Sequence, residues 1–258
     1  MNVTFLGTTA CIPDAGEDCP CFLVNGNCLF DCGWYAAGDL RECGIAPENI
    51  RTLVFTHMHH DHYLGLPTLL FYYIHSRSLP LDELTIAGPA EDLPHVIDTV
   101  YALLQTERFY PDLPRPKLIL LHPGDRFETD GLSFTVGKSD HQVQALSYRV
   151  TDKKDGRILG ASGDAVAHPE SIPFFAGCHA LIHDATLGWN ENEPPKTGRG
   201  HSTLQEAAQV AQGAGIPVLY PVHMARINAK NASERWTAAH PDAPLRIVPP
   251  ERGRTYDI

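Results

Sequence analysis

The sequence predicts an α/β fold from three observations. Short apolar runs of β type recur along the chain, and several of them end in polar motifs. Segments with helical periodicity lie between them, such as residues 66–74, where apolar side chains recur at three- and four-residue spacing. A chain of 258 residues can bury a substantial core, so we expect one domain spanning residues 1–258.

The net charge and the distribution of apolar residues exclude some classes of function. Lys and Arg number 20 against 31 Asp and Glu, and the net charge of −11 disfavours non-specific attraction to polyanions. A long RNA substrate is therefore not expected. The N-terminus lacks a basic, apolar leader, and no run approaches the roughly 18 apolar residues that cross a bilayer. We expect a cytoplasmic protein with no membrane partner.

The first half of the chain alternates strands and helices. Asn25-Gly26 between two apolar runs predicts a hairpin, and Pro67 suits the first turn of a helix. Strands are expected at residues 3–6, 21–24, 28–31, 52–55 and 84–87, and helices at 35–41, 67–75 and 93–104. Gly88-Pro89 is expected to form a turn. The irregular stretch 105–116 could rim an active-site mouth or pad the core.

The second half is richer in strands. Strands are expected at residues 117–121, 126–128, 132–137, 145–150 and 157–161, together forming the sheet of the second half. Further along, we expect a strand at 180–183, a helix at 202–214, a strand at 218–221, a helix at 232–239 and a strand at 245–248. The loop 189–200 could act as a mobile lid.

One motif carries the chemistry. His57, His59, Asp61 and His62 lie within six positions directly after the apolar strand 52–55. Such groups are costly to bury without partners, and a metal ion is the natural partner. On an extended chain His57 and His59 project the same way, whereas Asp61 and His62 follow a bend and could face a second ion. The motif therefore predicts a site for two metals, with Met58 and His60 as spacers.

The spacing His-x-His-x-Asp-His resembles the signature of the metallo-β-lactamase superfamily. Its remaining motifs recur in order as His141, Asp164 and His223, each just after a strand-like stretch. The resemblance implies a four-layer αββα sandwich. It also implies two sets of ligands, which are His57, His59 and His141 for one metal and Asp61, His62 and His223 for the other, with Asp164 bridging both.

Within that superfamily the chain is similar to ribonuclease Z and its phosphodiesterase relatives. The similarity lies in Val3–Thr8, Leu29–Gly33, Ile86–Pro89, His183-Asp184-Ala185-Thr186 and Gly200-His201-Ser202-Thr203. It implies that His201 donates a proton to the leaving group and that Asp184 orients it. Asp184 departs from the family, which usually has Glu there. The interval between His141 and Asp164 also leaves no room for the long arm with which ribonuclease Z clamps tRNA.

The tail after the last metal-motif histidine also departs from the family. Met224-Ala225-Arg226-Ile227 stands where the relatives usually have Ser-x-Arg-Tyr. Arg226 and the Thr203 hydroxyl are our candidates for binding phosphate oxygens, because guanidinium and hydroxyl groups suit that role.

Together these residues predict a dinuclear metal-dependent hydrolase, with Asp61, His201 and Asp184 in catalytic roles. Two divalent ions, zinc or else manganese or iron, would lower the pKa of a bridging water from about 16 toward neutrality. The expected substrate is a small phosphodiester or a nucleic-acid end. The alternatives are a lactone or thioester hydrolase, a mononuclear iron sulfur dioxygenase, or a metal-binding protein without catalysis. A homodimer is a further expectation.

Three sets of residues have roles that the sequence leaves open. Asp31 either supports the metal motif from a strand end or caps the following helix. Cys11, Cys19, Cys21 and Cys28 are expected to be buried or partly buried thiols, with a structural metal as the alternative. His168 and His179 have no recognisable partners and are expected to be structural.

Overall fold

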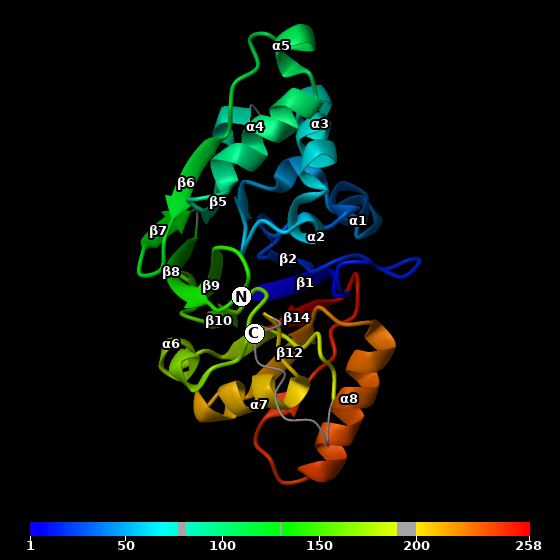
Figure 1. The fold of residues 1–258 in the computed structure, drawn as a ribbon, viewed down its shortest axis with the longest axis vertical. Coiled ribbons are helices and arrows are strands. Elements are labelled where there is room, and N and C mark those ends of the chain that lie inside the picture. The colour runs from blue at the N-terminus through cyan, green and yellow to red at the C-terminus, as the bar shows by residue number, and fades with distance from the viewer. Residues whose placement is uncertain (77–80, 130, 190–199) are drawn as a thin grey trace.

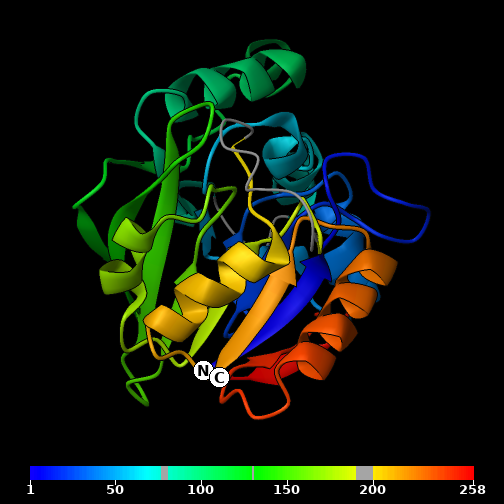
Figure 2. The same ribbon diagram turned by 60° about the horizontal axis from the view of Figure 1, so that its bottom comes forward.

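Two mixed β-sheets stack face to face, and helices cover their two outer faces (Figures 1 and 2). This arrangement comes from a computed structural model that describes residues 1–76, 81–129, 131–189 and 200–258. The N- and C-terminal strands pair with each other in the first sheet. The predicted αββα sandwich is confirmed. That the whole chain is one domain stays a prediction.

Each sheet contains seven strands within the described residues. The first sheet has, in spatial order, β14 (Thr255–Asp257), β1 (Asn2–Gly7), β2 (Cys21–Val24), β3 (Cys28–Phe30), β4 (Thr52–Val54), β5 (Thr85–Pro89) and β6 (Lys117–Leu121). The second sheet has β13 (Arg246–Ile247), β12 (Val218–Val222), β11 (Ala180–Asp184), β10 (Ile158–Ala161), β9 (Ala145–Asp152), β8 (Leu132–Ser139) and β7 (Arg126–Thr129).

The helices divide between the two outer layers. The first-sheet side carries α1 (Ala36–Glu42), α2 (His60–Tyr63), α3 (Leu66–Ser76), α4 (Leu93–Leu103) and α5 (Thr106–Phe109) (Figure 1). The second-sheet side carries α6 (Ile172–Phe175), α7 (Leu204–Gly213) and α8 (Arg226–Ala239) (Figure 1). In the part of the chain that the structure describes, no helix has the length and apolar character needed to cross a membrane.

Local chemistry accounts for the best-predicted elements. Asn25 and Gly26 both have positive φ, 50° and 76°, as a tight turn between antiparallel strands requires. They join β2 to β3, which pair in antiparallel register, so the predicted hairpin is confirmed. Helix α7 begins with a capping box, in which the Thr203 side chain accepts from the Glu206 backbone and the Glu206 side chain accepts from Thr203.

One strand was predicted in the wrong sheet. Lys117–Leu121, expected in the sheet of the second half, forms β6 and pairs with β5 in parallel at the edge of the first sheet. The physical reason is the α4 crossover, which returns the chain to the sheet it left, as helical connections between parallel strands do. Gly88 and Pro89, expected to turn, instead continue β5 opposite Leu120 and Leu121.

Two further differences concern the C-terminal region. The last helix begins at Arg226 and not near Ala232, because no Pro or Gly interrupts the segment after Ala225. Thr255–Asp257 forms β14, which the sequence analysis did not predict, since a three-residue edge strand has no readable periodicity.

Three apolar layers hold the sandwich together. Leu53 and Leu69 belong to the layer between the first sheet and its helices, and Leu219 to the corresponding layer of the second sheet. Between the sheets, the fully buried rings of Phe30 and Tyr148 meet edge to face at 5.6 Å. Burial of this apolar surface is the main stabilising contribution to such a fold.

The polar motifs lie along one edge of the sandwich. Strands β4, β8, β10, β11 and β12 all end at this edge, because β4 runs parallel to β3 and β5, and β10 to β11 and β12. The two sheets are also joined there, since the Leu146 N–H donates to the Thr56 carbonyl at 2.9 Å. The loops after these strands therefore face one another.

Asp18 braces the loop that follows β1. Its carboxylate is fully buried and accepts the backbone N–H groups of Cys19, Trp34 and Tyr35 at 2.8 to 3.0 Å. Burial raises the pKa of this carboxyl to about 7, and the nearby charge of Asp39 acts in the same direction against the three N–H donors.

We expect the contribution of Asp18 to the free energy of unfolding to fall as the pH rises from about 4 to about 7. The unfolded Asp18 carboxyl releases its proton near 3.8 and the folded one near 7, so the folded state holds the extra proton across this window. The loss is on the order of a few kcal/mol. Urea unfolding of the wild type and of Asp18→Asn across this range measures it, and equal pH slopes for both proteins would contradict the expectation.

Candidate metal centre

The local backbone after β4 sets out the first ligand candidates. His57 and His59 lie on extended chain, with His59 at φ −76° and ψ 153°, so their side chains leave on the same side. The chain then turns into α2, which carries Asp61 and His62 on its first turn. His60 belongs to none of the ligand groups found among the described residues, as expected for a spacer.

The first group comprises His57, His59 and His141, which reaches it from the end of β8. One nitrogen of each ring lies within 4.8 Å of the others. His59 Nδ1 and His141 Nε2 lie 3.0 Å apart. Three imidazole nitrogens so arranged suit one transition-metal ion.

The second group comprises Asp61, His62, Asp164 and His223, all of them buried. His223 Nε2 lies 3.0 Å from Asp61 Oδ2 and 3.2 Å from Asp164 Oδ2. His62 Nε2 lies 3.5 Å from Asp61 Oδ2 and 3.4 Å from Asp164 Oδ1. Two nitrogens and two carboxylates thus converge on a second position.

Asp164 lies between the two groups. Its Oδ2 is 3.7 Å from His57 Nε2 and 4.0 Å from His141 Nε2, and it also faces the second group. This is the position that a bridging carboxylate would need. The structure therefore brings together all seven residues that the sequence singled out as metal ligands.

Outer contacts fix which ring nitrogen faces inward. His62 Nδ1 contacts Asp31 Oδ2 at 2.9 Å, His57 Nδ1 contacts Thr56 Oγ1 at 3.1 Å, and His141 Nδ1 contacts the Gly200 carbonyl at 2.6 Å. When Nδ1 donates outward, Nε2 keeps a lone pair for a metal. The Nε2 atoms of His57 and His62 are buried without a hydrogen-bond partner, so the residues fit metal ions.

The electrostatics of the site also favour cations. Burial lowers the pKa values of His57, His59 and His141, so these imidazoles are neutral near pH 7 and able to coordinate. Burial acts against ionisation of Asp164, but the imidazoles of His223 and His62 outweigh it and hold its pKa well below the usual range.

His62 and His223 behave differently. Burial acts to lower the pKa of each ring, but nearby carboxylates, mainly Asp164, outweigh this effect. The pKa of each ring is therefore raised above its usual value. A proton and a metal ion compete for the same nitrogen, so these two rings are where a metal would displace protons.

Special backbone positions allow this convergence. Gly163 has φ +61°, and a Cβ there would lie 2.7 Å from Thr56 Cβ, so only glycine lets Asp164 approach. Gly200, at φ +72°, leaves the space in which its carbonyl meets His141. His223 and Asp31 adopt positive φ, 65° and 54°, which non-glycine residues rarely do and which is concentrated at functional sites.

A second cluster adjoins the metal ligands. His201 Nδ1 lies 2.8 Å from Asp184 Oδ2, and the His201 side chain keeps 20% of its surface exposed while Asp184 keeps none. Burial acts to lower the pKa of His201, but the hydrogen bond and charge of Asp184 outweigh it and raise the pKa. The pair has the arrangement expected of a proton donor and its orienting carboxylate.

Thr186 links this cluster to the metal ligands. Its hydroxyl donates to Asp184 Oδ1 at 2.6 Å and contacts His223 Nδ1 at 2.6 Å. This role of Thr186 was not predicted from its motif, His183-Asp184-Ala185-Thr186. The signal was its position two residues after the aspartate that ends a strand.

The structure resolves the role of Asp31 that the sequence left open. Asp31 supports the metal motif and does not cap α1, since its carboxylate accepts the N–H and hydroxyl of Thr56 and contacts His62 Nδ1. Thr203 is engaged in the capping box of α7, where its hydroxyl donates to Glu206 at 2.8 Å. Its role as a phosphate binder stays a prediction, as does that of Arg226, whose side chain lies outside the described residues.

The remaining candidates lie elsewhere. His168 pairs with Asp140 at 2.8 Å, and His179 Nδ1 accepts the Ile158 N–H at 3.1 Å, contacts consistent with structural roles. All seven cysteines are unpaired thiols, and none of them belongs to a ligand group among the described residues. Cys19, Cys21 and Cys28 are buried as expected, whereas Cys11 is exposed. The predicted lid falls largely on residues 190–199, outside the described part.

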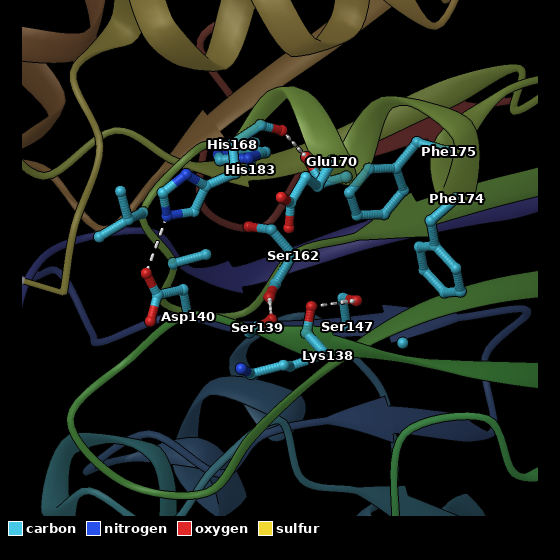
Figure 3. Close-up of a pocket in the computed structure, with 14 residues that line it drawn as sticks. Lys138, Ser139, Asp140, Ser147, Ser162, His168, Glu170, Phe174, Phe175 and His183 are labelled. Carbon is cyan, nitrogen blue, oxygen red and sulfur yellow. Dashed lines mark hydrogen bonds and ion pairs between the residues drawn. The ribbon is translucent and has the colours of Figure 1, made fainter.

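A pocket of about 390 Å³ is lined by Ser139, Ser162 and His183, among other residues (Figure 3). These three residues directly precede the loops of His141, Asp164 and Asp184. The Ser139 hydroxyl donates to the Ser162 carbonyl, and the Ser162 hydroxyl accepts the Asp184 N–H at 3.0 Å (Figure 3 labels both serines). These bonds hold three strand ends in one register.

Comparison with known proteins agrees with this geometry. The family model described as "Beta-lactamase superfamily domain" matches residues 26–224. Ribonuclease Z of Mycobacterium sp. strain KMS is 29% identical over 259 residues, covering 92% of this chain and 89% of that protein. The chain belongs to the metallo-β-lactamase superfamily.

Solved structures support the fold. The metallo-β-lactamase fold protein YhfI from Bacillus subtilis superimposes with a TM-score of 0.79 at 20% identity, covering 99% of this chain and 98% of that one. The short form of human tRNase Z gives a TM-score of 0.75 at 24% identity, covering 100% and 99%. Within its superfamily the chain is ribonuclease Z-like and a metal-dependent hydrolase.

We expect Asp31→Ala to lower metal affinity about 10- to 100-fold, because the variant loses the acceptor that orients His62. Asp31→Asn keeps an acceptor oxygen and should lie between Asp31→Ala and the wild type. Competition with a chromogenic chelator measures the affinity. Asp152→Ala, which removes a buried carboxylate bonded to Asn25, serves as the matched control. Wild-type affinity in Asp31→Ala would refute the orienting role.

Proposed function

We propose that the protein is a phosphodiesterase that uses two divalent metal ions. The observation that carries the proposal is the convergence of two ligand groups on Asp164, with the His201–Asp184 pair beside them. Seven ligands are too many for one tetrahedral ion, which supports two. A mixed set of imidazoles and carboxylates accepts zinc, and also manganese or iron.

Different side chains of the protein would bind the metal ions and donate the proton. His57, His59 and His141 would hold one ion and Asp61, His62 and His223 the other, with Asp164 shared. The ions would supply hydroxide near neutral pH and neutralise charge on the attacked phosphorus. His201 donates a proton to the departing oxygen, and Asp184 keeps its imidazole oriented and charged. Such a donor contributes roughly 10²- to 10⁴-fold to the rate.

The substrate we infer is a small phosphodiester or a nucleic-acid end. Relatives named ribonuclease Z and tRNase Z support phosphodiester chemistry. Between His141 and Asp164 the chain forms only β9, β10 and their connections, so no arm extends there to grip a folded RNA. The net charge of −11 points the same way. A cytoplasmic location and a homodimer remain expectations from the sequence.

We expect His201→Ala to leave metal bound and to slow turnover, with a larger defect for poor leaving groups. A p-nitrophenolate departs without a proton, so its release should slow less than that of an alkyl alcohol. The measurement is kcat for a p-nitrophenyl and an alkyl ester of the same phosphate, with metal content determined in parallel. Equal defects on both esters would show that His201 is not the proton donor.

A substrate panel tests the proposal as a whole. We expect hydrolysis of bis-p-nitrophenyl phosphate and small nucleotide phosphodiesters by protein that carries two ions per chain, and little cleavage of precursor tRNA. A lactone, a thioester and a persulfide complete the panel, since they would reveal the rival hydrolase and sulfur dioxygenase activities. Turnover confined to those three, or a single iron per chain, would refute the phosphodiesterase proposal.

A further inference from the structure

A second pocket, of about 330 Å³, lies between the loop that leaves β11 and one face of α8. Thr186, Gly188 and Trp189 line it on the loop side, and Asn228, Asn231 and Arg235 on the helix side. The three helix residues follow one another at three- and four-residue spacing, which places them on the same face of α8.

This pocket adjoins the metal centre through a shared residue. Thr186 lines the pocket and also contacts His223 Nδ1 at 2.6 Å and Asp184 Oδ1 at 2.6 Å. A group bound in the pocket would therefore lie next to the proton donor and the second ligand group.

The loop wall is fixed by backbone hydrogen bonds. The Leu187 N–H donates to the Ser202 carbonyl at 3.0 Å, and the Leu204 N–H donates to the Gly188 carbonyl at 2.9 Å. These bonds fasten the wall to the start of α7. A wall held in this way needs little reorganisation on binding, which is typical of ligand sites.

The helix wall offers hydrogen-bond donors and a positive charge. Arg235 makes no ion pair or hydrogen bond with the residues that the structure describes, although the chain carries a net charge of −11. Its neighbour Glu234 faces Lys230 instead, at 4.0 Å. The side-chain amides of Asn228 and Asn231 are also without a partner in the described ranges. One guanidinium and two amides supply enough donors for the oxygens of a phosphate.

We propose that this pocket binds a second phosphate group of the substrate, separate from the phosphodiester that is hydrolysed. The inference rests on the proposed function and narrows its substrate class to small phosphodiesters that carry a terminal phosphate, such as a 5′-phosphorylated dinucleotide. Arg235 binds the terminal phosphate through its guanidinium, and Asn228 and Asn231 donate to its remaining oxygens. No bond forms or breaks in the pocket.

The test uses two matched substrates, thymidylyl-thymidine with and without a 5′-phosphate, and the metal-loaded full-length protein. We expect the phosphorylated substrate to have a KM about tenfold lower in the wild type. Arg235→Ala should remove that advantage with kcat unchanged within about twofold, and Arg235→Lys should keep part of it. Lys230→Ala, which removes a cation from another face of α8, is the control and should behave as the wild type.

A binding measurement separates this proposal from the proposed function. Calorimetric titration compares thymidine 3′,5′-bisphosphate with thymidine 3′-phosphate, and the bisphosphate should bind about tenfold more tightly to the wild type but not to Arg235→Ala. Equal affinities in the wild type, or an Arg235→Ala effect of the same size on both ligands, would overturn the pocket assignment. A protein that binds the bisphosphate preferentially yet hydrolyses no phosphodiester would overturn only the proposed function.

Discussion

The buried carboxylate of Asp164 and the imidazoles around it are the interaction on which the site depends. Five imidazole rings each place a nitrogen between 3.2 and 4.0 Å from one of its oxygens, namely those of His57, His62, His141, His201 and His223. A carboxylate buried without partners would cost several kcal/mol, so the fold must deliver these partners from distant parts of the chain. It does so by ending five strands at one edge of the sandwich. The hydrogen bonds of Ser139 and Ser162 keep three of these strand ends in register and so help to bring the partners together.

The motif from His57 to His62 could be predicted because most of its information is local, whereas His141, Asp164 and His223 were indicated by the resemblance to a family. The alternation of side chains on an extended segment and the turn after it are properties of a few consecutive residues, and strand ends are readable from apolar runs. Sheet membership is not local. Residues 117–121 read as a strand in the sequence, but only the crossover of α4 decides that they join the first sheet. The short edge strand β14 could not be predicted from the sequence for a related reason, since its pairing with β1 is a tertiary contact.

The contacts that orient the metal ligands and the proton donor could not be predicted from the sequence. His141 is oriented by the backbone carbonyl of Gly200, and a carbonyl has no residue identity to recognise. Asp31 could equally have capped a helix until its distance to His62 was known. Asp184 is one methylene shorter than the glutamate usual in ribonuclease Z-like chains, yet it reaches His201 at 2.8 Å. Its backbone is held by Ser162, so the strand end places the shorter side chain correctly.

The two ligand groups also draw on both sheets, since His57 and His59 follow a strand of the first sheet while His141, Asp164 and His223 follow strands of the second. A bound ion would therefore join the two sheets, and the supply of metal would set how firmly they hold together. At a free concentration 100 times the dissociation constant, binding adds about 2.7 kcal/mol to stability. In a cell short of metal, the ion-free chain would open more often and become the form that proteases degrade first, so abundance of the protein would follow metal supply even with synthesis unchanged.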